Sequence, residues 1–142
     1  MDCTAEQAIW LAGFIDGEGS IGIMKRAKRD MGGYQPRVTI TNTNRQLLEE
    51  IKKWVGGGYL HWNRRTPADH RKDVFTLAVA NRIALNLIQE IRPYIRLKAE
   101  QADMFLHYYD VAVGPAGPSR GTLKTVQDNI YHAMRQLNRK GK

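Results

Sequence analysis

The sequence is poor in cysteine, and its candidate nucleophiles and metal ligands are scattered. Cys3 is the single cysteine among 142 residues, so no intramolecular disulfide and no cysteine-based zinc site can form. The four histidines lack the spacing of metal ligands, and no Ser-His-Asp or Cys-His arrangement can be argued from their positions. No secretory signal is recognisable, and no apolar run is long enough to span a bilayer. We therefore expect an intracellular protein without a membrane partner, in a compartment that the sequence leaves open (bacterial, archaeal, phage or organellar).

Acidic residues are also scarce relative to basic ones. The chain has 22 Lys and Arg residues against 14 Asp and Glu residues, which gives a formal net charge of +8. A domain this basic favours a polyanionic partner, most often nucleic acid, with a basic protein–protein interaction module as an alternative. The length indicates one domain over residues 1–142, and 42% hydrophobic residues are enough to build a core.

Hydrophobic periodicity predicts short helices and strands in a regular order. Thr4 and Gln7 form the pattern of a capping box at the start of the first helix. Asn42 or Asn44 can cap the second helix, and Asn81 can cap the third. The predicted helices cover about 5–16, 99–113 and 122–138, with two more that carry apolar residues between 47 and 55 and between 83 and 91. The predicted strands cover 20–28, 35–41, 59–65 and 73–80.

Each predicted strand alternates between an apolar face and a polar or basic face. The residues expected to point inward include Ile21, Val38, Ile40 and Trp62. Such strands form an antiparallel sheet with helices on one side only, which leaves the other face for solvent or a ligand. The sequence therefore predicts an α+β fold of order αββαββα with a core over about 4–100, followed by a C-terminal helical part over about 99–142.

The segment from Trp10 to Ser20 begins as an apolar helix and ends in two acidic residues. Gly13 and Gly17 lie on one helical face, where a second helix could approach almost to backbone contact. Asp16 and Glu18 come at the helix C-terminus, whose free carbonyls and partial negative charge attract cations. Two such helices packed through their glycines would bring two acidic ends together over divalent metals. The alternative is an ordinary glycine-containing helix with a glycine C-cap.

The string LAGFIDGEG at residues 11–19 resembles the motif that defines the LAGLIDADG homing endonucleases. The predicted element order agrees with the fold of that family over residue 8 to about 100, and the last forty residues match only in being helical. The resemblance implies a saddle-like sheet and a site-specific double-strand DNA endonuclease. Members with a single motif act as homodimers, so a long pseudopalindromic target and a staggered break across the minor groove are expected.

The resemblance also assigns roles to residues of the motif. Glu18 corresponds to the metal-binding acid of the family, and the Gly17 carbonyl could supply a further oxygen to Mg²⁺ or Mn²⁺. Asp16 is expected to hold the helix end and the following loop. Gly13 and Gly17 would form the dimer contact, and Lys98 resembles a lysine that stabilises transition-state charge or organises water.

One family feature does not map cleanly onto this sequence. The family has a polar residue, often Gln, at the end of the second strand, and the matching register here gives Ile40. An isoleucine cannot position water, so Thr41 or Asn42 would have to serve instead.

The polar faces of the strands supply the residues expected to contact DNA. Arginine suits guanine and glutamine suits adenine, but any one of these side chains can touch phosphate alone. The predicted DNA-binding residues are Met24, Arg26, Lys28, Gln35, Arg37, Thr39, His61, Asn63, Arg65 and Thr76.

A second class of function fits the same scaffold. A non-cutting binder, either an RNA maturase that assists intron splicing or a DNA-binding regulator, would bind nucleic acid without hydrolysing it. Magnesium-dependent nicking, compared with tight binding to structured intron RNA, separates these readings. A basic protein–protein module would instead bind nucleic acid weakly and without a steep dependence on salt.

Overall fold

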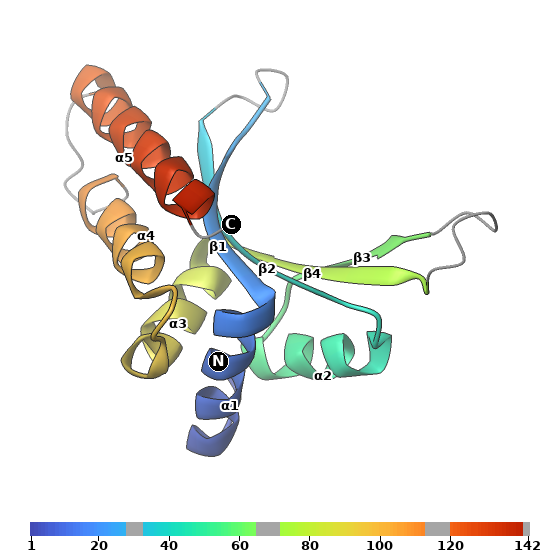
Figure 1. Ribbon diagram of the computed structural model, residues 1–142. Helices are drawn as coiled ribbons and strands as arrows, with labels where there is room; N and C mark the ends of the chain where they lie inside the picture. Colours follow the sequence, from blue (N-terminus) through green and yellow to red (C-terminus); the bar gives the residue numbers. More distant parts are fainter. Residues whose placement is uncertain (28–32, 65–71, 113–119, 141–142) are drawn as a thin grey trace.

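A four-stranded sheet carries all the labelled helices on one of its faces (Figure 1). The computed structural model describes residues 1–27, 33–64, 72–112 and 120–140. The elements in these ranges are α1 (Ala5–Glu18), β1 (Gly19–Lys25), β2 (Tyr34–Asn42), α2 (Arg45–Val55), β3 (Tyr59–Asn63), β4 (Val74–Ala80), α3 (Asn81–Ile91), the 3-10 turn η3 (Arg92–Tyr94), α4 (Ala99–Ala112) and α5 (Arg120–Lys140). The predicted α+β fold and its αββαββα order are confirmed.

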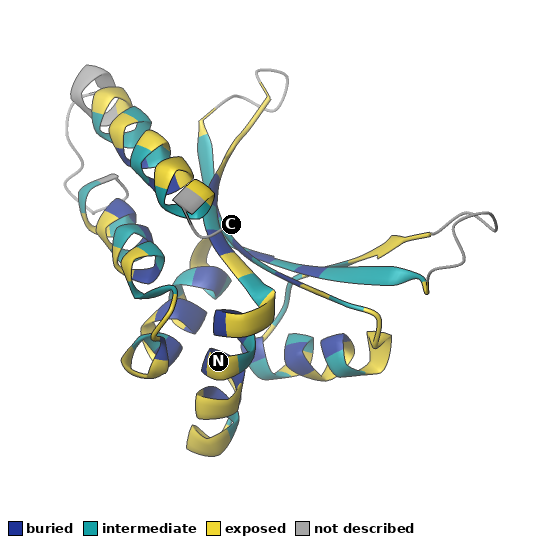
Figure 2. Cartoon of the chain, in the orientation of Figure 1, coloured by how far each residue is buried: buried dark blue, intermediate teal, exposed yellow. Residues whose placement is uncertain are grey.

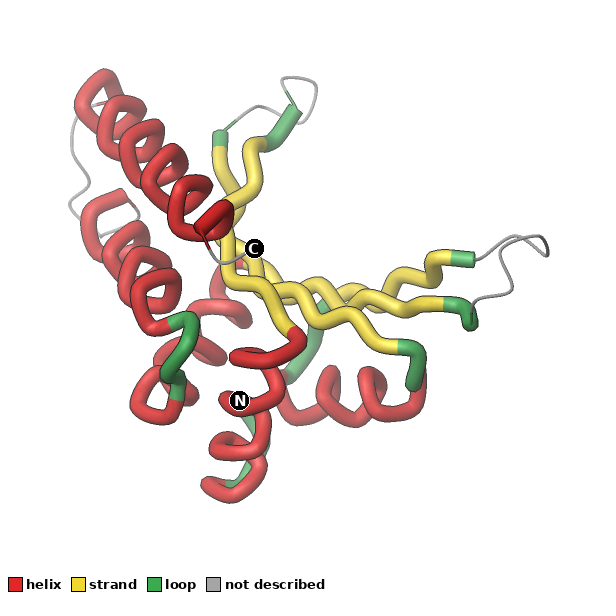
Figure 3. Tube along the Cα trace, in the orientation of Figure 1, coloured by secondary structure: helices red, strands yellow, loops and turns green. Residues whose placement is uncertain are grey.

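The strands are antiparallel and lie in the order β1-β2-β4-β3. Figure 3 shows two hairpin arms, β1–β2 and β4–β3, that diverge from a shared centre, so the face away from the helices is concave. Residues directly opposite one another share a face of the sheet. The pairings Gly22↔Arg37 and Arg37↔Ala80 therefore place Arg37 in the middle of the open face.

The core forms where the helices meet the centre of the sheet, as the burial colours show (Figure 2). Ile21, Val38, Ile40 and Leu77 point to the helical face and are fully buried. They belong to one apolar cluster with Phe105 and other helical side chains. Each such side chain contributes about 1.5–3 kcal/mol by leaving water, so the alternation in the strands fixes which face the helices cover.

Local signals in the sequence fix two helix starts. The Gln7 N–H donates to Thr4 Oγ1 at 3.1 Å and the Thr4 N–H donates to Gln7 Oε1 at 2.9 Å, which confirms the capping box of α1. Of the two asparagines that could cap α2, Asn44 does so, because its Oδ1 accepts from the Leu47 N–H at 3.1 Å. Gly56 ends α2 with a φ of 91°, a left-handed conformation that glycine adopts without steric cost.

Three local expectations were wrong. Asn81 does not cap α3: the cap residue is Ala80, no side-chain cap bond is present at this described helix start, and Asn81 has a φ of 55°. Trp62 points to the helical side but is 43% exposed, because α2 packs on β4 and β2 and leaves the edge strand β3 uncovered. Finally, α1 continues through Asp16 to Glu18, so the acids lie inside its last turn.

The C-terminal helix α5 packs against α4 and along the edge strand β1. The Tyr34 hydroxyl donates to Asp128, and the Tyr34 and Tyr131 rings lie 4.9 Å apart. Near the end of α5, Asn138 Nδ2 donates to the Ile21 carbonyl at 3.2 Å. A free strand edge is a template for unwanted pairing, so α5 protects the fold as well as extending its core.

Among the helices that the structure describes, none combines the length and the apolar character that a bilayer crossing requires.

Candidate functional site

Asp16 lies buried at the end of α1, where it holds the loop that precedes α4. Its Oδ2 accepts from the backbone N–H groups of Arg96 at 2.7 Å and Leu97 at 3.2 Å, and its Oδ1 accepts from the Lys98 N–H at 3.0 Å. The side chain is only 9% exposed. Asp16 therefore ties together two segments that are far apart in the sequence, and it is not free to bind a metal through both oxygens.

Glu18 is in a different environment although it is two positions further on. It is exposed, it makes no hydrogen bond or ion pair within the described ranges, and it is the last residue of α1 before β1 begins. The adjacent Gly17 is also exposed. The C-terminal end of a helix carries partial negative charge, so the position of Glu18 there adds to the attraction of its carboxylate for a cation.

Lys98 is positioned by the same contact that fixes Asp16. Its Nζ donates to the backbone carbonyl of Asp16, so the ammonium group lies at the end of α1, close along the chain to Glu18. Its own carbonyl accepts from the Ala102 N–H at 2.9 Å and starts α4. The structure thus brings Lys98 into contact with Asp16, two positions before Glu18 in the chain.

The end of the second strand contains the candidates for a polar residue that positions water. Ile40 is fully buried opposite Gly19, so it cannot meet a solvent molecule. Thr41 is exposed, and its hydroxyl lies 3.0 Å from that of Thr76. Asn42 Oδ1 accepts from the Asn44 N–H at 2.8 Å, which leaves its amide nitrogen available.

A hollow of about 600 Å³ lies on the concave face of the sheet. Six of the predicted DNA-binding residues line it: Gln35, Arg37, Thr39, His61, Asn63 and Thr76. Ala78 and Ala80 also line the hollow, and both lie on β4, between β2 and β3. Their short side chains leave space above this strand. These six predicted residues come from three neighbouring strands, so they form one continuous surface.

Two more of the predicted contacts lie toward the end of the β1–β2 arm. Met24 is 47% exposed opposite Gln35, and Arg26 is exposed just after β1 ends. Lys28 and Arg65 fall outside the described residues.

Tyr59 is a residue of this surface that the sequence interpretation missed. It is 68% exposed, lines the hollow and stacks with His61 at a ring separation of 6.2 Å. Tyr59 alternates with His61 and Asn63 along β3, and this pattern in the sequence could have placed it on the same face.

The outer face of α1 is uncovered and apolar. Ile9 is 50% exposed and Trp10 is 44% exposed, while Leu11 and Ile15 on the inner face are fully buried. A methyl group built on Gly13 or on Gly17 would meet nothing within 4 Å outside the helix itself. The exposed side chains of Ile9 and Trp10 therefore give α1 an uncovered apolar patch.

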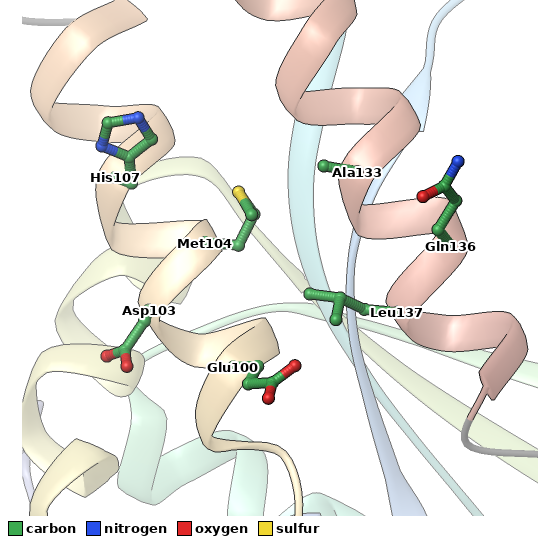
Figure 4. Close-up of a pocket in the computed structure, with 7 residues that line it drawn as sticks. All are labelled: Glu100, Asp103, Met104, His107, Ala133, Gln136 and Leu137. Carbon is green, nitrogen blue, oxygen red and sulfur yellow. The ribbon is translucent and has the colours of Figure 1, made fainter.

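A separate hollow of about 480 Å³ lies between α4 and α5 (Figure 4). Met104 and Leu137 line it from the two helices, and Asp103 lines it from α4. Arg92 donates to the Asp103 carboxylate at 2.6 Å from Nε and 2.9 Å from Nη2, and these hydrogen bonds lower the pKa of Asp103. This carboxylate is therefore already occupied by a structural partner.

The fold and the acidic end of α1 define a protein of the homing-endonuclease type. A family model described as LAGLIDADG endonuclease matches residues 11–109, and the chain belongs to that family. Membership supports the DNA endonuclease predicted from the sequence. No curated protein matches the chain.

Solved structures of homing endonucleases share the fold at low sequence identity. I-CvuI in complex with its target in the presence of Ca²⁺ has a TM-score of 0.76 and 19% identity, over 94% of this chain and 82% of that chain. The archaeal intron-encoded I-Vdi141I complexed with DNA has a TM-score of 0.74 and 20% identity, over 93% and 84%. I-SmaMI bound to cleaved DNA has a TM-score of 0.70 and 19% identity, over 95% of this chain and 44% of that chain.

Proposed function

We propose that the chain is a site-specific double-strand DNA endonuclease of the homing type that acts as a homodimer. The observation that carries the proposal is the position of Glu18. Its exposed carboxylate lies where α1 ends and β1 begins, at the border of the concave polar face. A duplex bound on that face would bring its phosphates close to this carboxylate.

Phosphodiester hydrolysis at this place requires a divalent cation, Mg²⁺ or Mn²⁺, which activates water and neutralises charge on the phosphate. The Glu18 carboxylate and the Gly17 carbonyl are oxygen ligands of the kind that hard cations prefer. Within the described ranges, no group of three or more His, Cys, Asp or Glu side chains could hold a metal. Mg²⁺ is usually held by one or two carboxylates together with substrate phosphates and waters, so DNA phosphates and the Glu18 of a second copy would complete the set. Structures of I-CvuI in the presence of Mg²⁺ and of Ca²⁺ support the use of such ions.

Supporting roles follow from the contacts around Glu18. Asp16 positions the loop before α4, and Lys98 holds a positive charge near the scissile phosphate, where it stabilises the transition state. Thr41, which is exposed and lies just beyond the Gly19↔Ile40 pair, is better placed to position water than Ile40. Asn42 is the second candidate for that role.

The homodimer is supported by the uncovered face of α1. Packing Gly13 and Gly17 against the same residues of a second copy would cover Ile9 and Trp10 and bring two Glu18 side chains together. A two-fold dimer presents two concave faces side by side, so its target should be long and pseudopalindromic. The two copies of Glu18 would serve one scissile phosphate in each strand.

The decisive experiment is cleavage of selected duplexes. Duplexes that bind the protein are enriched from a randomised library, incubated with Mg²⁺, and examined for breaks in both strands. We expect Glu18→Gln to retain binding and to lose cleavage by at least about a hundredfold, because it removes the charged metal ligand. Lys98→Met should slow cleavage by about the same factor with a smaller effect on binding.

Glu6→Gln is the matched control, since Glu6 is an exposed acid in the first turn of the same helix. Full cleavage by Glu18→Gln would reject the role assigned to Glu18. Tight binding of structured intron RNA with no nicking of any duplex would favour the maturase instead. A DNA-binding regulator would bind a duplex site and leave it intact.

A further inference from the structure

Arg37 occupies a central, half-buried position on the concave face. Across the sheet it is opposite Gly22 on β1 and opposite Ala80 on β4. Neither neighbour has a long side chain, and the amide group of Asn138 lies 3.5 Å from where a Cβ on Gly22 would stand. Gln35 and Thr39, on the same face of β2, flank it along the strand and line the same hollow.

The hydrogen bonds of Arg37 fix the direction of its guanidinium. Nη2 donates to Gln35 Oε1 at 2.8 Å. Nε is buried and has no hydrogen-bond partner, the one such side-chain atom in the described part of the chain. Nη1 makes no hydrogen bond with the described residues and is not among the buried atoms that lack a partner, so part of its surface is exposed. The group is therefore anchored through one N–H of Nη2, and the second N–H of Nη2 and those of Nη1 remain for a ligand at its outer end.

This geometry decides which recognition mode is open to Arg37. A guanidinium can present two parallel N–H groups either from its side, through Nε and Nη2, or from its end, through Nη1 and Nη2. Burial of Nε closes the side approach, and the end remains available. Two parallel donors match the O6 and N7 acceptors of guanine in the major groove, and the adenine edge offers only one acceptor there.

Gln35 has a different role from the one that its residue type suggests. A free glutamine would recognise adenine with both its donor and its acceptor. Here the acceptor oxygen is already used by Arg37 Nη2, so the bidentate adenine contact is not available without breaking this bond. Gln35 is thus a positioning residue that acts through Arg37.

We propose that Arg37 selects guanine at one position of each half-site and that Gln35 holds its guanidinium in the selecting orientation. This inference rests on the proposed function, because it assumes that a DNA major groove lies on the concave face. It adds a base identity to a surface whose target is otherwise unspecified.

The test is to determine base preferences by binding selection from a randomised duplex library, for the full chain and its variants. A bidentate contact discriminates by roughly 5- to 150-fold against other bases. We expect the wild type to select guanine at one position per half-site. Arg37→Ala should lose that preference while keeping the others. Arg37→Lys, which keeps the charge but not the rigid pair of donors, should weaken the preference and retain most of the overall affinity.

Variants of Gln35 distinguish positioning from direct reading. Gln35→Ala should weaken the guanine preference at the same position, and Gln35→Glu, which keeps an acceptor for Arg37, should restore it. Arg45→Ala is the control for loss of an arginine, because Arg45 lies on α2 and pairs with the exposed Glu49 at 3.1 Å. It should leave every base preference unchanged.

The possible failures are distinguishable. If the wild type selects no duplex, the proposed function and this inference both fall. If it selects a site but Arg37→Ala weakens binding to all sequences equally, Arg37 touches only phosphate and this inference alone is wrong. Loss of an adenine preference in Gln35→Ala would also overturn it. Far-ultraviolet circular dichroism of each variant confirms that the fold is retained.

Discussion

The two acids of the α1 terminus show how strongly the surroundings of a residue determine what it can do. Asp16 is 9% exposed and accepts three backbone hydrogen bonds from the loop before α4. Glu18, two positions later, is exposed. A carboxylate whose oxygens are saturated by backbone donors orders the chain, whereas an exposed carboxylate can exchange water for a cation. The carboxylate of Asp16 thus stabilises the fold, and the carboxylate of Glu18 has the proposed role in catalysis.

Asp16→Asn tests the structural role directly. The substitution keeps the shape but replaces one acceptor oxygen by an NH₂ group that faces backbone N–H donors. We expect a loss of about 1–3 kcal/mol in the free energy of unfolding, the cost of leaving buried donors without an acceptor. The measurement is urea denaturation followed by circular dichroism. Asp2→Asn, at an exposed terminal position, is the control, and an unchanged midpoint in Asp16→Asn would contradict the assignment.

The sequence predicted which residues belong to the candidate site better than it predicted the contacts that these residues make. The motif was sufficient to select Asp16 and Glu18, and alternation along β2 placed Arg37 and Gln35 on the open face. The hydrogen bonds of Asp16 to residues 96–98 and the bond between Arg37 and Gln35 were not predictable, because they depend on how distant segments pack and on which rotamers the packing permits.

At the scale of elements, the attachment of α5 to the β1–β2 arm is the feature with least support in the sequence. Periodicity predicted a helix but not the surface on which it would pack. In the structure Tyr34 is the main link, since its hydroxyl donates to Asp128 and its ring packs on Tyr131. The order of the core elements, in contrast, followed from caps and alternation, because those signals are local.

The link through Tyr34 predicts a specific alkaline pH dependence. Burial and the hydrogen bond to Asp128 raise the pKa of Tyr34 to about 12 from an ordinary value of 10. The folded state therefore favours the neutral phenol, so the stabilisation is complete below pH 10 and is lost as the pH rises toward 12. Between these values the wild type should lose more stability than Tyr34→Phe, measured as urea midpoints.

Tyr59→Phe serves as the control for that comparison, since Tyr59 is 68% exposed and far from α5 in the sequence. Its midpoint should fall with pH in parallel with that of the wild type. Parallel curves for the wild type and Tyr34→Phe would show that the phenol does not contribute to the attachment of α5.

For the whole molecule, the arrangement of surfaces matters more than the net charge of +8. One side of the sheet is closed by helices, the other side is a concave polar surface, and α1 leaves an exposed apolar face on the helical side. Element order and the open face could be predicted from alternation. The exposure of the outer face of α1 could not be predicted, because it depends on which residues of that helix pack against the core.

The proposed dimer predicts opposite effects of one substitution on the monomer and on the assembly. Gly13 lies inside α1 without a positive φ, and an added methyl group would meet nothing within 4 Å outside the helix. Gly13→Ala should therefore stabilise the isolated chain by up to about 1 kcal/mol through helix propensity. In the dimer the same methyl group would keep two helix backbones apart, so the dissociation constant should rise at least about tenfold.

Sedimentation equilibrium over a dilution series measures the dissociation constant, and denaturation at concentrations where the monomer dominates measures its stability. Asn86→Ala is the matched control, because Asn86 is an exposed position in α3, where alanine also improves helix propensity. It should raise monomer stability and leave dimerisation unchanged. If Gly13→Ala dimerises as the wild type does, or if the wild type stays monomeric when bound to its selected duplex, the glycine face of α1 is not the dimer interface, and the two copies of Glu18 are not brought together by it.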